Sequence, residues 1–377
     1  MIVQGSQEVG KAPNPIISRG DVAVKKQRSS NLELYRIICM LMIVAHHYVA
    51  NSGLNFSGGP IVNNPNSFNS IFLSIFGAWG KTGINCFMMI TGYYMCTSKI
   101  SLKKFLKLLL WIYFYKLLLF PVFLAAGYES LSLKRLVELI APFWKLSNNF
   151  TGNFLVFFLT IPFWNILIQN ITERQHILLT MLLVTCYTVL GTIPSFTLTY
   201  NYISWFGVIY LIASYIRLYP HTVFQRKDLW GWVTLLSFLL ASLSILRLKY
   251  WLIIDSNKFF ALEIAVCMFL WFKNLDIHYN KVINAIGAST FGVLMIHANS
   301  DAMRKWLWQD VVDCVGKYSL PLGQLILYCV GTVLAIFLIC TLIDQLRIST
   351  IERWFFNWYD NKISMKADRL VKKITQS

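Results

Sequence analysis

Charged side chains are scarce in this 377-residue chain, where Asp, Glu, Lys and Arg make up only 14% of the residues. An ordinary soluble domain carries about 25%, because its surface has to be hydrated. Hydrophobic residues make up 56% of the chain and aromatic residues 15%. A surface this poor in charge has to face an apolar phase, which argues against a soluble globular enzyme. We therefore predict an all-α, polytopic integral membrane protein.

Three further absences narrow the class of protein. The eight cysteines form no CxxC pair, which argues against a zinc site, so we expect no metal and treat the thiols as small buried hydrophobic groups. No internal repeat is visible, and this disfavours the inverted-repeat transporters. Residues 1–29 lack the apolar segment of a cleavable signal peptide.

Long apolar runs, in contrast, are abundant. A spanning helix needs roughly 20 mostly apolar residues, because the hydrocarbon layer is about 30 Å thick. The runs predict about ten transmembrane helices, near residues 32–51, 70–95, 105–126, 152–168, 175–191, 200–218, 230–247, 258–272, 282–298 and 321–346.

Basic residues outnumber acidic ones by 34 to 17, which gives a net charge of +17. If the N-terminus is cytoplasmic, more than twice as many Lys and Arg residues fall in the predicted cytoplasmic segments as in the external ones. The positive-inside rule therefore favours N- and C-termini that are both cytoplasmic. We interpret the basic excess as a topology signal that also suits anionic membrane lipid, and we expect no nucleic-acid partner.

The chain divides into three predicted parts. Residues 1–30 are predicted to form a disordered basic cytoplasmic tail, because they are polar and interrupted by Pro and Gly. Residues 31–346 form the transmembrane domain. Residues 347–377 form a basic amphipathic cytoplasmic tail, which we expect to lie along the inner membrane surface.

Ionisable residues inside the apolar runs are the candidates for chemistry, because charges in a membrane are costly. Arg36 opens the first run, and His46 and His47 stand towards its end. Eleven helical residues bring His47 within roughly 20° of Arg36, about 16 Å along the axis, whereas His46 points roughly 80° away. The alternative is that Arg36 reaches the lipid phosphates and both histidines are satisfied at the interface.

Other polar residues in the runs are weaker candidates. Lys81, Asn85 and Thr91 belong to the second run, where glycines allow close helix packing or a break in the backbone. Glu263 lies in the eighth run and is expected to face a cavity or a partner. His297 closes the ninth run, where a lone histidine is more often an interface residue than a catalytic one.

At these positions the chain resembles the membrane acyltransferase-3 family. Arg36, ten intervening residues and His47 match the Arg-x10-His signature of that family. The stretch Gly80–Phe87, continued to Tyr94, is similar to its second-helix segment, Pro162–Asn165 to a helix end, and Thr290–His297 to its late helix. Where the family often opens the fourth span with Trp-Phe, this chain has Gly152 and Asn153, which puts the acceptor in doubt more than the reaction class.

The resemblance implies a bacterial O-acyltransferase in the cytoplasmic (inner) membrane. It would move an acyl group, commonly acetyl, from cytoplasmic acyl-CoA (acetyl-CoA) to a hydroxyl of a cell-surface glycan or its lipid-linked precursor. In that case His47 and Arg36 are catalytic, with His47 as the general base. The donor-binding candidates are Arg36, Lys81, Asn85 and Thr91, and the acceptor-binding candidates are His297, His46 and Glu263.

Two other classes stay open at this point. A transporter or flippase for a lipid-linked sugar or polysaccharide would use the same intramembrane charges as a permeation path and would bind no CoA. A non-catalytic membrane scaffold would tolerate replacement of Arg36 and His47. A covalent acyl-enzyme also remains an option within the enzyme class, and an oligomer is compatible with the sequence.

Overall fold

The computed structural model describes residues 28–141, 150–196, 201–248 and 250–363, and these residues form helices and loops without a β-strand. The all-α prediction is therefore confirmed for them. The helices are α1 (Ser30–Ala50), α2 (Pro60–Asn63), α3 (Phe68–Phe76), α4 (Gly80–Met95), α5 (Leu102–Ala125), α6 (Leu133–Ile140), α7 (Phe150–Asn170), α8 (Glu173–Val184), α9 (Tyr202–Leu218), α10 (Lys227–Leu248), α11 (Phe259–Lys273), α12 (Lys281–His297), α13 (Asp301–Lys305), α14 (Leu322–Arg347) and α15 (Arg353–Lys362).

Every predicted apolar run contains one of these helices, but the expected ten crossings are not confirmed. Among the described residues, five helices are long and apolar enough to cross a bilayer, and a sixth is obtained if the bent pair at α12 and α13 counts as one span. The remaining runs fold into shorter helices. Two of these, α9 and α11, have mostly buried side chains, so neighbouring helices separate much of their surface from lipid.

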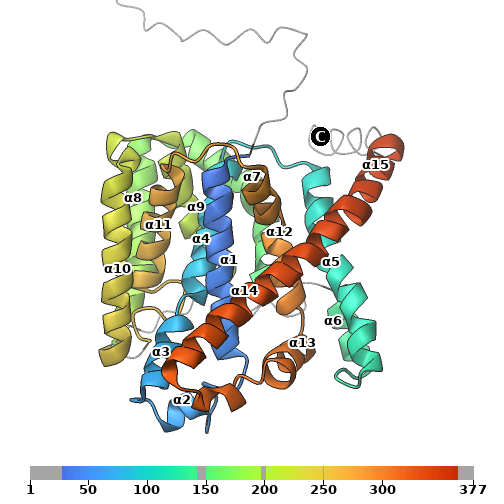
Figure 1. Ribbon diagram of the computed structural model, residues 1–377. Helices are drawn as coiled ribbons and strands as arrows, with labels where there is room; N and C mark the ends of the chain where they lie inside the picture. The colour runs from blue at the N-terminus through green and yellow to red at the C-terminus, as the bar shows by residue number, and fades with distance from the viewer. Residues whose placement is uncertain (1–27, 142–149, 197–200, 249, 364–377) are drawn as a thin grey trace, which may run out of the picture.

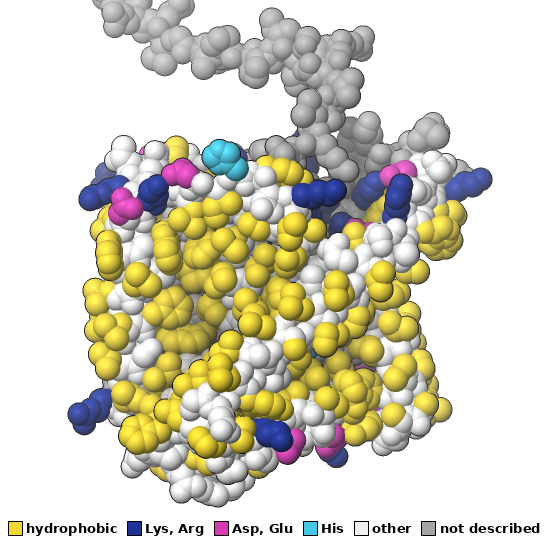
Figure 2. Space-filling model, in the orientation of Figure 1, with side chains coloured by type: hydrophobic (Ala, Val, Ile, Leu, Met, Phe, Trp, Pro, Cys, Tyr) yellow, Lys and Arg dark blue, Asp and Glu magenta, His cyan; other side chains and the backbone are white. Residues whose placement is uncertain are grey.

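The outside of the bundle is divided into a belt and two ends. Figure 2 shows hydrophobic side chains over the middle of the molecule and most Lys, Arg, Asp and Glu side chains at its two ends. In Figure 1 the beginning of α1 and the end of α15 lie at the same end of the bundle. This arrangement is compatible with termini on one side of a membrane, and the assignment of that side to the cytoplasm stays a prediction.

A row of glycines on and beside α4 fixes the position of α1. A Cβ atom on Gly77, Gly80 or Gly83 would meet Val49, His46 or Ile43 respectively at 2.3–2.7 Å. The glycines advance by three residues while their partners retreat by three, as two antiparallel helices require. The sequence predicts close packing or a backbone break here, and both occur, because α3 ends at Phe76 before α4 starts at Gly80.

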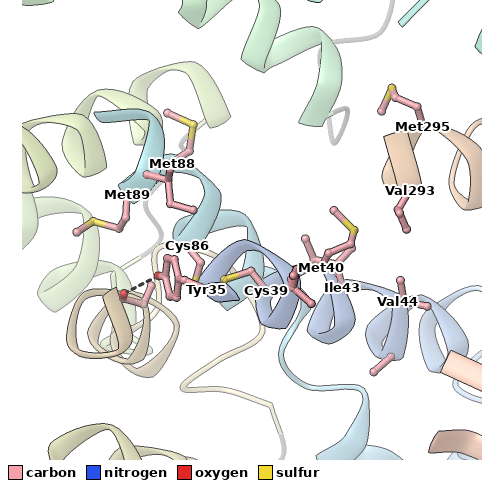
Figure 3. Packing of buried hydrophobic residues seen from close by; sticks show 14 of the residues in the cluster. Tyr35, Cys39, Met40, Ile43, Val44, Cys86, Met88, Met89, Val293 and Met295 are labelled. Atoms are coloured by element: carbon pink, nitrogen blue, oxygen red, sulfur yellow. Dashed lines mark hydrogen bonds between the residues drawn. The ribbon is translucent and has the colours of Figure 1, made fainter. Parts of the chain in front are cut away.

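The hydrophobic core is built around α1, which packs against α4, α11, α12 and α14. Figure 3 shows Tyr35 and Cys39 of α1 beside Cys86 of α4, with Val293 and Met295 of α12 farther along α1. The Tyr35 hydroxyl donates a hydrogen bond of 3.0 Å to the carbonyl of Ala265 on α11. Both cysteines are fully buried, as expected for thiols that serve as packing groups.

Helix α14 crosses the front of the bundle obliquely and continues through a π-helical turn (Ile348–Glu352) into α15 (Figure 1). A buried ion network holds this crossing. Arg347, 2% exposed, donates hydrogen bonds to Asp344 at 2.8 Å and to Glu352 at 2.9 Å. Most of the predicted tail 1–30, and residues 364–377 of the predicted tail 347–377, lie outside the described residues.

Candidate active site

A cavity of about 480 Å³ opens beside the last turns of α1, at the end of the bundle away from the described termini. We call it the histidine cavity. Its size lies within the range of about 300–1,000 Å³ that is usual for small-molecule sites. Its walls come from α1, α4, α5, α6, α7, α9 and α12 and from the segment after α12; the lining side chains include His46, His47, Lys81, Lys116, Arg135, Glu138, Tyr202 and Arg304.

His47 is held by a chain of hydrogen bonds that fixes its protons. The Nδ1 atom of His297 lies 2.6 Å from the carbonyl oxygen of Val293. A carbonyl only accepts, so His297 carries its proton on Nδ1, and its neutral ring offers Nε2 as an acceptor. That Nε2 lies 2.9 Å from Nδ1 of His47. His47 therefore donates from Nδ1, and in the neutral ring its own Nε2 keeps a free lone pair.

His46 is fixed in a similar way by the main chain. Its Nδ1 atom lies 2.6 Å from the carbonyl oxygen of Gly77, in the break between α3 and α4. The ring also packs against Gly80. Although the helical angle separates His46 from the line through Arg36, His46 and His47 both line the cavity, because the cavity wraps around the end of α1.

Cationic side chains surround the two histidines. Lys81 donates a hydrogen bond of 2.7 Å to the hydroxyl of Tyr202 and lies 3.7 Å from Asp255. Lys116 enters from α5, where its ammonium group lies 3.4 Å from the carbonyl of Glu138. The cavity lining contains four cations and three carboxylates: Lys81, Lys116, Arg135 and Arg304 against Glu129, Glu138 and Asp301.

The carboxylates in the lining are engaged by the two arginines. Arg135 contacts Glu129 at 3.3 Å and Glu138 at 2.8 Å. Arg304 contacts Asp301 at 2.9 Å. The two arginines thus engage all three carboxylates of the lining, while Lys81 is paired with Asp255 outside it.

Arg36 lies near the other end of α1, on the face that carries Met40, Ile43 and His47 at helical spacing. Since α1 is one continuous helix from Ser30 to Ala50, the predicted separation of about 16 Å along the axis applies. Ile43 and His47 both line the histidine cavity. The guanidinium group of Arg36 lies 3.3 Å from Glu33 and does not reach the cavity.

The predicted site residues divide into two groups. His46, His47 and Lys81 share the cavity, whereas five other candidates do not line it. Arg36 lies near the start of α1, outside the cavity, and the fully buried His297 is hydrogen-bonded to His47. Asn85 is buried between α4, α9 and α11, where it donates to the carbonyls of Ser256 and Ala261 at 2.7 and 2.9 Å and accepts from Trp205.

The other two candidates have local partners. The Thr91 hydroxyl donates to the carbonyl of Phe87, one turn earlier in the same helix. Glu263 accepts a hydrogen bond of 2.6 Å from Ser237 of α10. A sequence candidate on an apolar run can thus be a packing residue, because the run does not tell which face borders the cavity.

The sequence analysis did not identify the charged lining residues that come from α6 and α13. Arg135 and Glu138 belong to α6, a short helix with no buried residue, and Arg304 belongs to α13. Both helices lie between apolar runs, in stretches that hydropathy treats as connections. The amphipathic spacing of α6 was the one signal available.

Comparison with known families now adds an independent observation. A family model described as an acyltransferase domain, that of the membrane acyltransferase-3 family, matches residues 29–343. This range is most of the chain and includes every helix that lines the histidine cavity. Comparisons with curated proteins and with solved structures find no match. The match includes Arg36, His47 and His297, the residues on which the predicted resemblance depended. This chain therefore belongs to the membrane acyltransferase-3 family and is a membrane acyltransferase.

Proposed function

We propose that this acyltransferase moves an acyl group, acetyl in the first instance, from cytoplasmic acyl-CoA to a hydroxyl of a cell-surface glycan or its lipid-linked precursor. The observation that carries the proposal is the orientation of His47. Its Nδ1 proton is engaged by His297, and its Nε2 lone pair belongs to a ring that lines the cavity. A neutral imidazole in this state is a general base.

The reaction balances with His47 as the proton carrier. The acceptor hydroxyl gives its proton to Nε2 of His47 while its oxygen attacks the thioester carbonyl carbon. The carbon–sulfur bond then breaks, and the CoA thiolate takes the proton back from His47. The unprotonated Nε2 of His297 stabilises the imidazolium that exists between these steps, because it accepts a hydrogen bond from the charged ring. In this scheme His297 is a positioning residue rather than an acceptor-binding one.

The donor is proposed to approach along the face of α1 that bears Arg36. A guanidinium group is suited to the phosphates of CoA, because its planar fork donates paired hydrogen bonds. Glu33 accompanies Arg36 and also lies 3.6 Å from Arg28, so two arginines share one carboxylate and a positive charge remains. The separation of Arg36 and His47, about 16 Å, is comparable to the length of a pantetheine arm.

The acceptor is proposed to enter the histidine cavity from the end opposite the described termini. If the termini are cytoplasmic, that end faces outward, where surface glycans or lipid-linked sugars are found. Lys81 and Lys116 lie in the lining and can stabilise the negative charge that develops on the carbonyl oxygen.

The first test is thermal stability of purified wild-type and Arg36→Ala protein with and without acetyl-CoA. A ligand that binds only the folded protein stabilises it by RT ln(1 + [L]/Kd) and so raises the unfolding midpoint. We expect a rise in wild type that shrinks in Arg36→Ala. Absence of a shift with acetyl-CoA and with longer acyl-CoAs would contradict acyl-CoA as the donor of this acyltransferase.

The second test separates the two histidines by transfer activity. His47→Ala is expected to lower kcat by about 10²- to 10⁴-fold, the usual contribution of a general base, while the protein still inserts and binds acetyl-CoA. His46→Ala is the matched control, since it removes a neighbouring ring with the same chemistry, and it should be far milder. Equal losses in both variants would refute the assignment of the base.

A further inference from the structure

A second cavity, of about 840 Å³, lies at the end of the bundle where α1 begins. It is formed by the ends of α4, α9 and α11, by the beginning of α10 and by the segments that join them. We call it the basic pocket. Its lining includes four cations and two carboxylates: Arg217, Arg226, Lys227 and Lys273 against Asp228 and Asp276.

One of the four cations in the basic pocket forms an ion pair among the residues that the structure describes. Lys227 contacts Asp276 at 2.8 Å, and this hydrogen bond holds the pKa of Asp276 below its ordinary value. For the other three cations, no ion pair occurs among the residues that the structure describes. Arg217 donates to the hydroxyl of Tyr93 at 3.0 Å, and Lys273 donates to the amide oxygen of Asn274 at 3.1 Å. Both partners are uncharged.

The cations are also held close together. Arg217 lies over the ring of Tyr93, 4.9 Å from its centroid, which orients the guanidinium group. Arg217 and Lys273 line the same cavity, so their like charges share one small space. Like charges that line one cavity repel each other, and a bound anion offsets this repulsion.

The basic pocket adjoins the end of α1 that carries Arg36. Asn31, in the first turn of α1, donates a hydrogen bond of 2.8 Å to the carbonyl of Lys273. Arg36 follows about 7 Å further along the helix.

We infer that the basic pocket binds the 3′-phosphate end of the nucleotide of the acyl donor, with Arg217, Arg226 and Lys273 contacting that phosphate while Arg36 contacts the diphosphate. This rests on the proposed function, which supplies a CoA thioester as donor. It extends that function because the nucleotide is recognised by α9, α10 and α11, outside the Arg-x10-His helix. The pantetheine arm would then run from the diphosphate at Arg36 to His47.

The experiment measures equilibrium binding of three donors to protein in a zwitterionic detergent. Acetyl-CoA has the complete nucleotide, acetyl-dephospho-CoA lacks the 3′-phosphate, and acetyl-pantetheine lacks the nucleotide altogether. We expect the affinity of wild type to fall in that order. The double variant Arg226→Gln and Lys273→Gln should bind acetyl-CoA at least about tenfold more weakly, the effect of losing one charged hydrogen bond, and should bind acetyl-pantetheine as wild type does.

Two controls keep the result interpretable. Unchanged binding of acetyl-pantetheine shows that the double variant is folded and that its path to His47 is intact. Arg174→Gln removes an exposed cation at the same end of the bundle but outside the pocket, and it should bind acetyl-CoA as wild type does. An equal loss in Arg174→Gln would show a general charge effect and overturn the inference.

The remaining outcomes separate this inference from the proposed function. If wild type binds acetyl-CoA and the double variant binds it equally well, the nucleotide site is refuted while the proposed function stands. If wild type binds none of the three donors, both fail. Anionic lipid headgroups have similar phosphate chemistry. If added phosphatidylglycerol stabilises wild type but not the double variant, while acetyl-CoA binding is the same in both, the pocket is a lipid site and the inference is overturned.

Discussion

The replacement His297→Leu tests the hydrogen-bonded pair at the centre of the site. Leucine fills much of the same buried volume but cannot accept the Nδ1 proton of His47, which the 2.9 Å contact with His297 now binds. The His47 ring then loses the partner that fixes its tautomer. Once the proton can reside on Nε2, that atom no longer serves as the base.

The size of the effect follows from the cost of an unsatisfied buried polar group, about 1–3 kcal/mol. Since 1.4 kcal/mol corresponds to a factor of ten, kcat should fall by about 5- to 150-fold. This is less than the loss expected from His47→Ala, because the imidazole itself remains. Binding of acetyl-CoA should be unaffected, so the defect should appear in kcat and not in the affinity for the donor.

The assay is acyl transfer from acetyl-CoA under single-turnover conditions, together with donor binding. His297→Gln is the matched variant, because its amide oxygen can accept from His47 while its amide nitrogen donates to the Val293 carbonyl. It should recover part of the lost rate. Wild-type kcat in His297→Leu would refute the tautomer reasoning, and so would the absence of any difference between the two variants.

Three further predictions concern stability. Arg347→Ala leaves the buried carboxylates of Asp344 and Glu352 without their guanidinium partner. It should therefore lower the free energy of unfolding by about 3–5 kcal/mol, measured by thermal melting in detergent. An unchanged melting midpoint would contradict a stabilising role of this network. Asn85→Ala removes two donated hydrogen bonds and one accepted one and should cost at least about 1–3 kcal/mol in the same measurement. Gly80→Ala places a Cβ 2.3 Å from the His46 ring, whereas Gly331→Ala meets nothing within 4 Å; the first should lower both the melting midpoint and transfer, and the second should lower neither.

The sequence predicted those features that depend on local periodicity. Each apolar run became helical, and Arg36 and His47 lie on one face of a single uninterrupted helix. The number of crossings did not follow, because several runs form helices too short to span a bilayer alone, and their burial depends on neighbours that hydropathy does not identify.

The composition of the site could be predicted only in part. The approach of His297 to His47 joins residues 250 positions apart, and no periodic pattern records which helices meet. Asn85 carried the same polar signal as Lys81, yet the structure buries it between three helices. Arg135 and Arg304 come from short helices in the connections, so a search restricted to the apolar runs could not find them.

The proton arrangement around His47 starts from a main-chain carbonyl, that of Val293. Every amino acid supplies such a carbonyl, so mutation of residue 293 to another helix-compatible residue leaves the tautomer of His297, and through it that of His47, in place. At position 293 the proton arrangement depends on the path of the backbone, whereas at the two histidines it depends on the identity of the side chain.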